Sequence, residues 1–191
     1  PIYGKSETIS RLFTAYYLYR HPERWVGVNS YGASLAYTLS RSARDNVRRA
    51  GVELSVEGVE QWETTEGGGL WAAGVGGPIT GKGFHLGVID DPIKNAEESN
   101  SLTVRENHKD WYRSTFGTRE EPGAAIVIVL TRWNEDDLAG WLLGTEKDDD
   151  EDSEQWTILS MEAIKTDMPP SFPANCTLID DDRQVGEALC P

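Results

Sequence analysis

The sequence predicts an α/β domain with a mainly parallel central sheet. Apolar runs of strand length alternate six times with segments that have helical periodicity. Residues 84–89 and 124–130 are apolar almost throughout, as expected for strands covered on both faces. A chain of 191 residues suits one large domain, which at this size needs neither disulfide nor metal to hold a core.

The first half of the chain contains two predicted helices. Apolar side chains recur at helical spacing in residues 6–20 and 33–50, and a glycine follows the second segment. Residues 25–29 between them form a short predicted strand. Residues 52–75 contain short strands around a triple-glycine turn, so we interpret them as an insertion and not as a crossover helix.

The second half continues the alternation. The strand predicted at 84–89 runs into Asp90-Asp91-Pro92, and a helix is predicted at 97–116. Residues 124–130 give the strongest strand signal in the chain. Because polar residues follow them directly, we expect a second buried strand that ends at a functional edge of the sheet.

The end of the chain is less regular. We expect a short helix at 136–143, a solvated acidic loop at 146–154 and a last strand at 156–163. We expect residues 1–165 to form one domain that lacks its first strand, because the chain begins inside a motif and without Met. Residues 166–191 should be a linker toward a further domain that is absent here.

Composition excludes some classes of protein. The formal net charge is −14, which argues against a simple DNA-binding module. Adaptation to high salt is one explanation of this charge, and an acidic loop plus ordinary surface variation is the other. Only two cysteines are present and the three histidines lack metal-ligand spacing, so we expect a reducing, cytoplasmic setting. No run of residues suits a membrane span or signal peptide.

The first candidate site is Gly4-Lys5-Ser6, at the start of the first predicted helix. A phosphate-binding loop needs a glycine turn, a lysine for the β- and γ-phosphates and a hydroxyl for Mg²⁺. The alternative is that Ser6 only caps the helix. A second match, residues 76–82, ends in Gly83 where a hydroxyl is required and precedes a strand, so we reject it as the nucleotide site.

Asp90 and Asp91 support the first candidate. Two carboxylates at the end of a buried strand are costly unless a cation or an opening lies there. Asp90 would hold the hydration shell of Mg²⁺, and Asp91 would orient or deprotonate the attacking water. The alternative is a strand that ends in a polar turn before a proline. Thr131, after the strand at 124–130, stands where a residue can sense the γ-phosphate.

These segments together resemble the large terminase subunit of tailed viruses, the motor that packages double-stranded DNA into procapsids. The similarity is carried by GKSE at 4–7, SYGASLAYTLSRSARD at 30–45, GGGLWAAGVGGPITGKG at 67–83, IDDP at 89–92, WYRSTFGTREEPGAAIVIVLTRWNEDDLAG at 111–140 and GEALCP at 186–191. The resemblance implies a P-loop NTPase fold (RecA-like, ASCE), a three-layer sandwich.

The resemblance also implies roles. Gly4, Lys5 and Ser6 would bind ATP, Ser6 and Asp90 would hold Mg²⁺, Asp91 would be the catalytic carboxylate, and Thr131 would belong to the coupling motif. The implied partners are double-stranded DNA, a portal protein, a small terminase subunit and further copies in a ring, without a membrane. The implied location is the host cytoplasm, with transient docking on the procapsid. A nuclease domain would follow in the full-length protein.

Some positions depart from the family pattern. Ile2 and Tyr3 replace the Arg-His pair that often precedes the motif, so an arginine finger would come from a neighbouring subunit or from elsewhere in the domain. The candidates in this chain are Arg113, Arg119 and Arg132. Because the loop is incomplete, we expect these 191 residues alone to bind ATP weakly.

Two other functions stay open: a helicase-like ATPase stimulated by nucleic acid, and a nucleotide-binding assembly module without turnover. Arg41, Arg44 and Arg48 share a helix face and would contact DNA phosphates or simply offset the helix dipole. Trp62, Trp71 and Trp111 are interpreted as core residues.

Overall fold

The computed structural model describes residues 4–79, 81–145, 155–167, 172 and 176–189. It contains two compact units, one formed by Gly4–Asn134 and one that includes Glu135–Pro191. This division does not test the expected domain limit at residue 165 or the linker after it, which stay predictions. Each unit is described by itself.

The first unit contains a six-stranded sheet with the strand order β2-β3-β4-β1-β5-β6. The strands are β1 (Trp25–Ser30), β2 (Leu54–Glu57), β3 (Gln61–Thr64), β4 (Gly69–Gly74), β5 (Phe84–Asp90) and β6 (Glu120–Val129). Strands β4, β1, β5 and β6 are parallel, whereas β3 pairs antiparallel with β4 and β2 with β3. The predicted α/β class with a mainly parallel sheet is confirmed. The short strands expected within 52–75 are present, and β4 joins the parallel part of the sheet.

The helical segments of this unit are the π-helix η1 (Glu7–Phe13), α1 (Thr14–Arg20), α2 (Ala33–Arg49), α3 (Ala96–Asn100), α4 (Leu102–Trp111), the π-helix η2 (Tyr112–Phe116) and the 3-10 turn η3 (Gly117–Arg119). The helices predicted at 6–20 and 33–50 are confirmed, although the first begins as a π-helix. The single helix predicted at 97–116 is wrong. Ser101 has an extended backbone, and its hydroxyl accepts from the N–H of Val104, so it ends α3 and caps α4.

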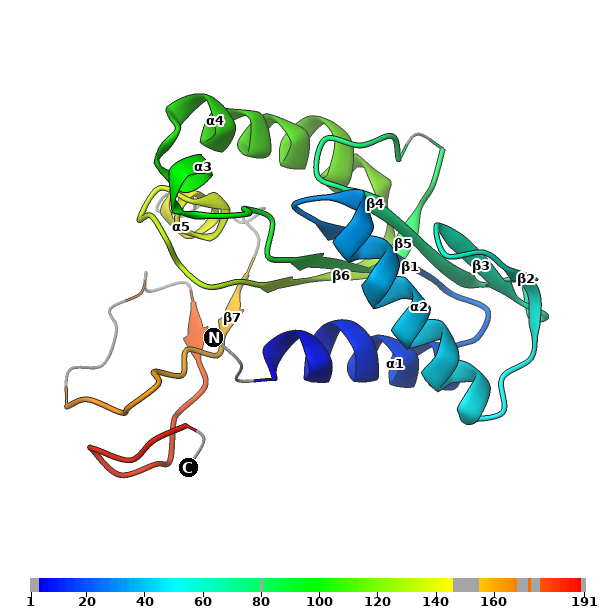
Figure 1. Ribbon diagram of the computed structural model, residues 1–191, viewed down its shortest axis with the longest axis horizontal. Helices are drawn as coiled ribbons and strands as arrows, with labels where there is room; N and C mark the ends of the chain where they lie inside the picture. The colour runs from blue at the N-terminus through cyan, green and yellow to red at the C-terminus, as the bar shows by residue number, and fades with distance from the viewer. Residues whose placement is uncertain (1–3, 80, 146–154, 168–171, 173–175, 190–191) are drawn as a thin grey trace. The chain divides into compact units, whose positions relative to one another are not determined.

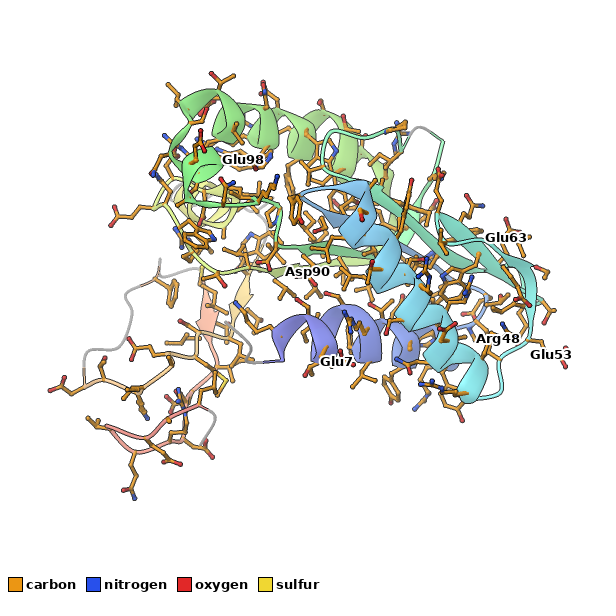
Figure 2. All side chains as sticks on the ribbon, viewed as in Figure 1. Glu7, Arg48, Glu53, Glu63, Asp90 and Glu98 are labelled. Atoms are coloured by element: carbon orange, nitrogen blue, oxygen red, sulfur yellow. The ribbon has the colours of Figure 1, made fainter. Side chains whose placement is uncertain are left out.

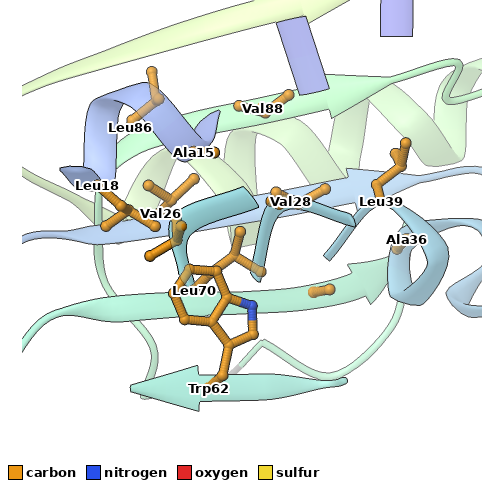
Figure 3. Packing of buried hydrophobic residues seen from close by; sticks show 13 residues of the cluster. Ala15, Leu18, Val26, Val28, Ala36, Leu39, Trp62, Leu70, Leu86 and Val88 are labelled. Atoms are coloured by element: carbon orange, nitrogen blue, oxygen red, sulfur yellow. The ribbon is translucent and has the colours of Figure 1, made fainter. Parts of the chain in front are cut away.

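Helices cover both faces of this sheet, with α1 and α2 on one face and α4 on the other (Figure 1). Alternate strand residues point to opposite faces. On the first face, side chains of β1, β4 and β5 pack against α1 and α2 to form the main core (Figure 3). Its members include Leu18, Val28, Leu39 and Val88. Trp62 closes this core, and its indole N–H donates to the hydroxyl of Ser40 (3.1 Å).

Aromatic side chains dominate the other face. The rings of Phe84 and Phe116 lie 4.7 Å apart, and Trp71 packs beside Phe84 at 6.3 Å. A Cβ added at Gly87 would come within 2.7 Å of both phenylalanine rings, and one added at Gly27 within 2.4 Å of Trp71. Both strands therefore need glycine at these positions to let the aromatic layer approach the sheet. Trp62, Trp71 and Trp111 are all buried, which confirms that they are core residues.

β6 differs from its prediction as a second buried strand. Of its residues only Val129 is buried, while its other apolar side chains are half-buried or exposed. The reason is its place in the sheet, because among the described strands β6 is the last in the order and pairs only with β5. An apolar sequence shows that a strand can be buried. How far its side chains are buried depends on the elements that pack beside it.

The second unit has little regular structure in its described residues. The helix predicted at 136–143 is confirmed as α5 (Leu138–Thr145). The strand predicted at 156–163 is wrong in extent, since only Thr157–Ile158 form a strand, β7, paired with β8 (Thr177–Leu178). The acidic run at 146–154 lies outside the described residues. None of the described helices combines the length and apolar character that crossing a membrane requires.

Candidate functional site

The segment Gly4-Lys5-Ser6 leads directly into η1. Gly4 has a φ of +73°, which glycine adopts without strain, and its carbonyl accepts from the N–H of Thr8 (2.8 Å). Ser6 already has helical backbone angles, and its side chain makes no capping hydrogen bond. The alternative in which Ser6 only caps the helix is therefore wrong.

Two serine hydroxyls bind the two oxygens of Asp90. Ser6 donates to Oδ1 (2.9 Å) and Ser10 donates to Oδ2 (2.5 Å). Asp90 is the last residue of β5 and is only 1% exposed. Figure 2 shows Asp90 between the sheet and the blue helix that begins the described chain. The first helix thus lies against the end of β5 through hydrogen bonds to one buried carboxylate.

The surroundings of Asp90 have opposing effects on its acidity. Burial raises the pKa of this carboxyl above its ordinary value, because it penalises the charged form. The hydrogen bonds from Ser10 and Ser6 lower the pKa, the neighbouring charge of Asp91 raises it, and Lys5 lowers it. The net result is a raised pKa. A cation beside this carboxyl group would therefore stabilise its charged form.

Lys5 connects the same segment to the end of β6. Its ammonium group donates to the carbonyl of Leu130 (2.7 Å) and to Oγ1 of Thr131 (3.0 Å). The side chain is exposed. Lys5 is therefore held by two oxygen acceptors while still accessible to a ligand with negative charge.

Asp91 has a backbone conformation that is uncommon for a residue with a side chain. Its φ is +43°. Both neighbouring segments hold it there, since its N–H donates to the carbonyl of Val129 (2.8 Å) and its carbonyl accepts from the N–H of Tyr31 (3.1 Å). Strain of this kind concentrates at functional sites, where the surroundings over-determine the backbone. The turn after β5 is consequently a fixed position for the second carboxylate and not a loose strand end.

The structure brings together all six predicted site residues: Gly4, Lys5, Ser6, Asp90, Asp91 and Thr131. They gather at the carboxyl ends of β5 and β6, the edge at which open α/β sheets bind ligands. Arg119 does not join them. It precedes β6 at the opposite end of the strands, roughly 20 Å away by strand length. Arg132 follows Thr131 directly and stays a candidate finger, as does Arg113.

The arginines of α2 have structural partners. Arg44 donates to the carbonyls of Glu57 (2.6 Å) and Gly58 (3.1 Å), and Arg48 lies 3.0 Å from the carboxylate of Glu57. Both tie α2 to the turn after β2. Arg41 is exposed, so the alternative in which this face contacts DNA phosphates rests on Arg41 more than on the other two.

Ser10 also belongs to the candidate site, and the sequence interpretation missed it. It is fully buried and bonds Asp90 from the helix turn after Ser6. The sequence did contain a pattern that could have indicated it. Ser6 and Ser10 both carry a hydroxyl, and residues four positions apart lie on one helix face. What could not be seen in the sequence is that this face points at a carboxylate 80 residues later.

The donors present suit Mg²⁺ better than a metal held by protein alone. No cluster of three or more His, Cys, Asp or Glu in metal-binding geometry occurs in the described part of the chain. Ser6 and Asp90 instead offer a hydroxyl and a carboxylate beside an exposed lysine. Mg²⁺ typically takes one or two such ligands and completes its shell with water and substrate phosphates. The side chains therefore fit an ion that arrives with a phosphorylated ligand.

Comparison with known protein families indicates which family this chain belongs to. The model of one protein family, described as terminase large subunit, T4likevirus-type, N-terminal, matches residues 2–180. The chain belongs to this family. The match spans Lys5, Asp90 and Thr131 in one continuous region, so the site described above lies within the terminase domain. A search of curated proteins finds no match. Membership supports a role of the terminase chain in viral DNA packaging.

Proposed function

We propose that this chain is the ATPase part of the packaging motor, which hydrolyses ATP with Mg²⁺ to translocate double-stranded DNA into the procapsid. The observation that carries the proposal is the joining of Lys5 to Thr131 and of Ser6 to Asp90 at one edge of a parallel sheet. In this reading the fold is a P-loop NTPase. Lysine, hydroxyl and carboxylate are the groups that phosphoryl transfer from a nucleotide requires.

Each residue has a distinct task in this proposal. Gly4 and the N–H groups that follow it cradle phosphate, and Lys5 offsets the charge of the β- and γ-phosphates. Ser6 and Asp90 hold Mg²⁺, which neutralises charge on the phosphates. Asp91 orients the attacking water and accepts its proton, since its backbone is fixed. Thr131 senses the state of the γ-phosphate through Lys5.

The experiment is single-turnover ATP hydrolysis by the full gene product that contains these residues. Asp91→Asn keeps side-chain size and tolerates the positive φ but cannot accept the proton, so hydrolysis should fall by about 10²-fold or more. Lys5→Ala should reduce hydrolysis comparably. The matched control is Lys82→Ala, which removes the lysine of the rejected second motif and should leave the rate unchanged.

The outcomes separate the alternatives. Equal rates for the wild type and Asp91→Asn would contradict catalysis by Asp91 at this site. If both rates equal the uncatalysed rate, the assembly module that only binds nucleotide is favoured. Strand separation of duplex DNA would favour a helicase-like ATPase. Assembly as a ring on a portal protein, with a small terminase subunit, belongs to the same proposal. Its test is ATP-dependent protection of DNA from nuclease inside procapsids.

A further inference from the structure

We infer that Ser10 is a positioning residue that fixes Asp90 through Oδ2, so that Oδ1 stays directed at Ser6, and that Ser6 and Asp90 would then be placed to hold Mg²⁺. This inference rests on the proposed function and extends it to a residue outside the motif. It concerns the metal-dependent part of nucleotide binding. Ser10 itself need not touch the nucleotide.

The geometry separates the tasks of the two serines. Ser6 is half-buried and lies at the start of the helix, whereas Ser10 is 0% exposed. Each donates to a different oxygen of Asp90, at 2.9 Å and 2.5 Å. A hydroxyl has one proton to donate, so the bond from Ser10 occupies Oδ2 from the protein side. The oxygen left for exchange with a ligand is the one beside Ser6.

The helix holds Ser10 in this position. Buried residues Ser10, Thr14 and Leu18 follow one another at four-residue intervals on the side that faces the sheet. Ser10 lies inside the π-helix η1, and the N–H of Thr14 reaches back five residues to the carbonyl of Ile9. π-helical segments are rare in proteins and are frequently found at functional sites. The core contacts of Leu18 therefore fix where the helix lies along the sheet, and so which residue of the helix contacts Asp90.

A buried carboxylate needs donors to keep one orientation. Asp90 has lost most of its contact with water, and a carboxylate with a single hydrogen bond would rotate about χ2, which is a broad torsion. The second bond, from Ser10, removes that freedom. Charge-assisted bonds of this type are the strong ones. Loss of the Ser10 hydroxyl should thus weaken metal-dependent nucleotide binding more than it weakens the stability of the fold.

The test measures binding of a fluorescent ATP analogue to the full gene product, once in Mg²⁺ and once in EDTA. Ser10→Ala and the isosteric Ser10→Cys, a weak donor, should weaken binding in Mg²⁺ by about 10-fold and leave binding in EDTA unchanged. Ser10→Thr keeps the hydroxyl, so it should bind the analogue more tightly in Mg²⁺ than in EDTA, as the wild type does. Thr8→Ala is the matched control, since it removes an exposed hydroxyl from the same helix.

The possible results are distinct. Wild-type binding in Mg²⁺ by both Ser10→Ala and Ser10→Cys overturns the inference, and so does equal weakening in Mg²⁺ and EDTA, which marks a merely structural role. If Ser10→Ala fails to fold, Ser10→Cys and Ser10→Thr decide the matter alone. Absence of any Mg²⁺-dependent binding by the wild type would overturn the proposed function itself, and the inference with it.

Discussion

The ammonium group of Lys5 lies 3.0 Å from Oγ1 of Thr131, a residue 126 positions later in the chain. The same group also reaches the carbonyl of Leu130 at 2.7 Å. Lys5 therefore joins the glycine segment to the end of β6 through its own side chain. A phosphate that draws the lysine toward itself would have to compete with both oxygens, so the end of β6 can respond to the ligand.

Thr131→Val tests this link, because valine keeps the shape of the side chain but removes the hydroxyl. We expect ATP binding to change by less than about threefold, since Lys5 keeps its bond to Leu130, while DNA-stimulated hydrolysis falls by about 10-fold. Phosphate release and nucleotide binding measure the two quantities. Thr131→Ser should behave as the wild type, and a Thr131→Val protein with unchanged stimulation would contradict the role.

Asp90→Asn should alter the pH dependence of stability. The folded pKa of Asp90 lies above its unfolded value, so the folded state binds the proton more tightly. That contribution to stability is complete below the unfolded pKa and is lost as the pH rises through the folded pKa. Relative to the wild type, Asp90→Asn should therefore gain stability across this acidic window and keep the gain at neutral pH. Urea unfolding at a series of pH values measures it, and a constant difference would count against burial as the cause.

Asp91 should tolerate some replacements better than others because of its φ of +43°. Asp91→Gly should be neutral or stabilising, and Asp91→Asn close to neutral, whereas Asp91→Ala should lose about 1 kcal/mol. Urea unfolding of the three variants gives the order. An alanine variant as stable as the glycine variant would mean that the backbone strain is not real.

Gly87→Ala should destabilise the first unit. The added Cβ would meet Phe84 and Phe116 at 2.7 Å, and overpacking of this kind costs about 1–3 kcal/mol. Thermal unfolding provides the measurement. Gly144→Ala is the control, because in the described part of the chain no atom outside its own helical backbone lies within 4 Å of its added Cβ, and alanine favours a helix. Equal effects of the two substitutions would contradict the tight aromatic layer.

The net charge of −14 makes a prediction about salt. If the acidic surface is an adaptation to high salt, screening should relieve its self-repulsion and raise the free energy of unfolding between low and molar KCl. Denaturation with urea, which is uncharged, measures this. Equal stability and solubility in both conditions would instead favour the explanation by an acidic loop.

The sequence predicted the parts of the site that lie on short motifs. Gly4, Lys5 and Ser6 are adjacent, and Asp90 and Asp91 stand at the end of a strand that is apolar except for His85, so local pattern was enough. Parallel strands bring their carboxyl ends to one edge, which is why Thr131 could be placed there too. The likeness to terminases, which the family match confirms, came from longer segments than any single motif.

Other features depend on contacts between distant segments. The bond from Ser10 to Asp90 needs the helix to lie at one height on the sheet, and no local pattern encodes that height. β6 was expected to be buried because its residues are apolar, yet exposure depends on its position at the end of the strand order. The break at Ser101 was hidden because serine is also tolerated inside helices.

The position of β6 also affects how the isolated polypeptide should behave. Residues 124–129 are uncharged and apolar, and in the described part of the chain this strand pairs on one side only. A strand edge of this composition is a template for intermolecular β-pairing. In concentrated solutions of these 191 residues, aggregation should start at β6, and the strong negative charge of the surface would be the main force that keeps the copies apart.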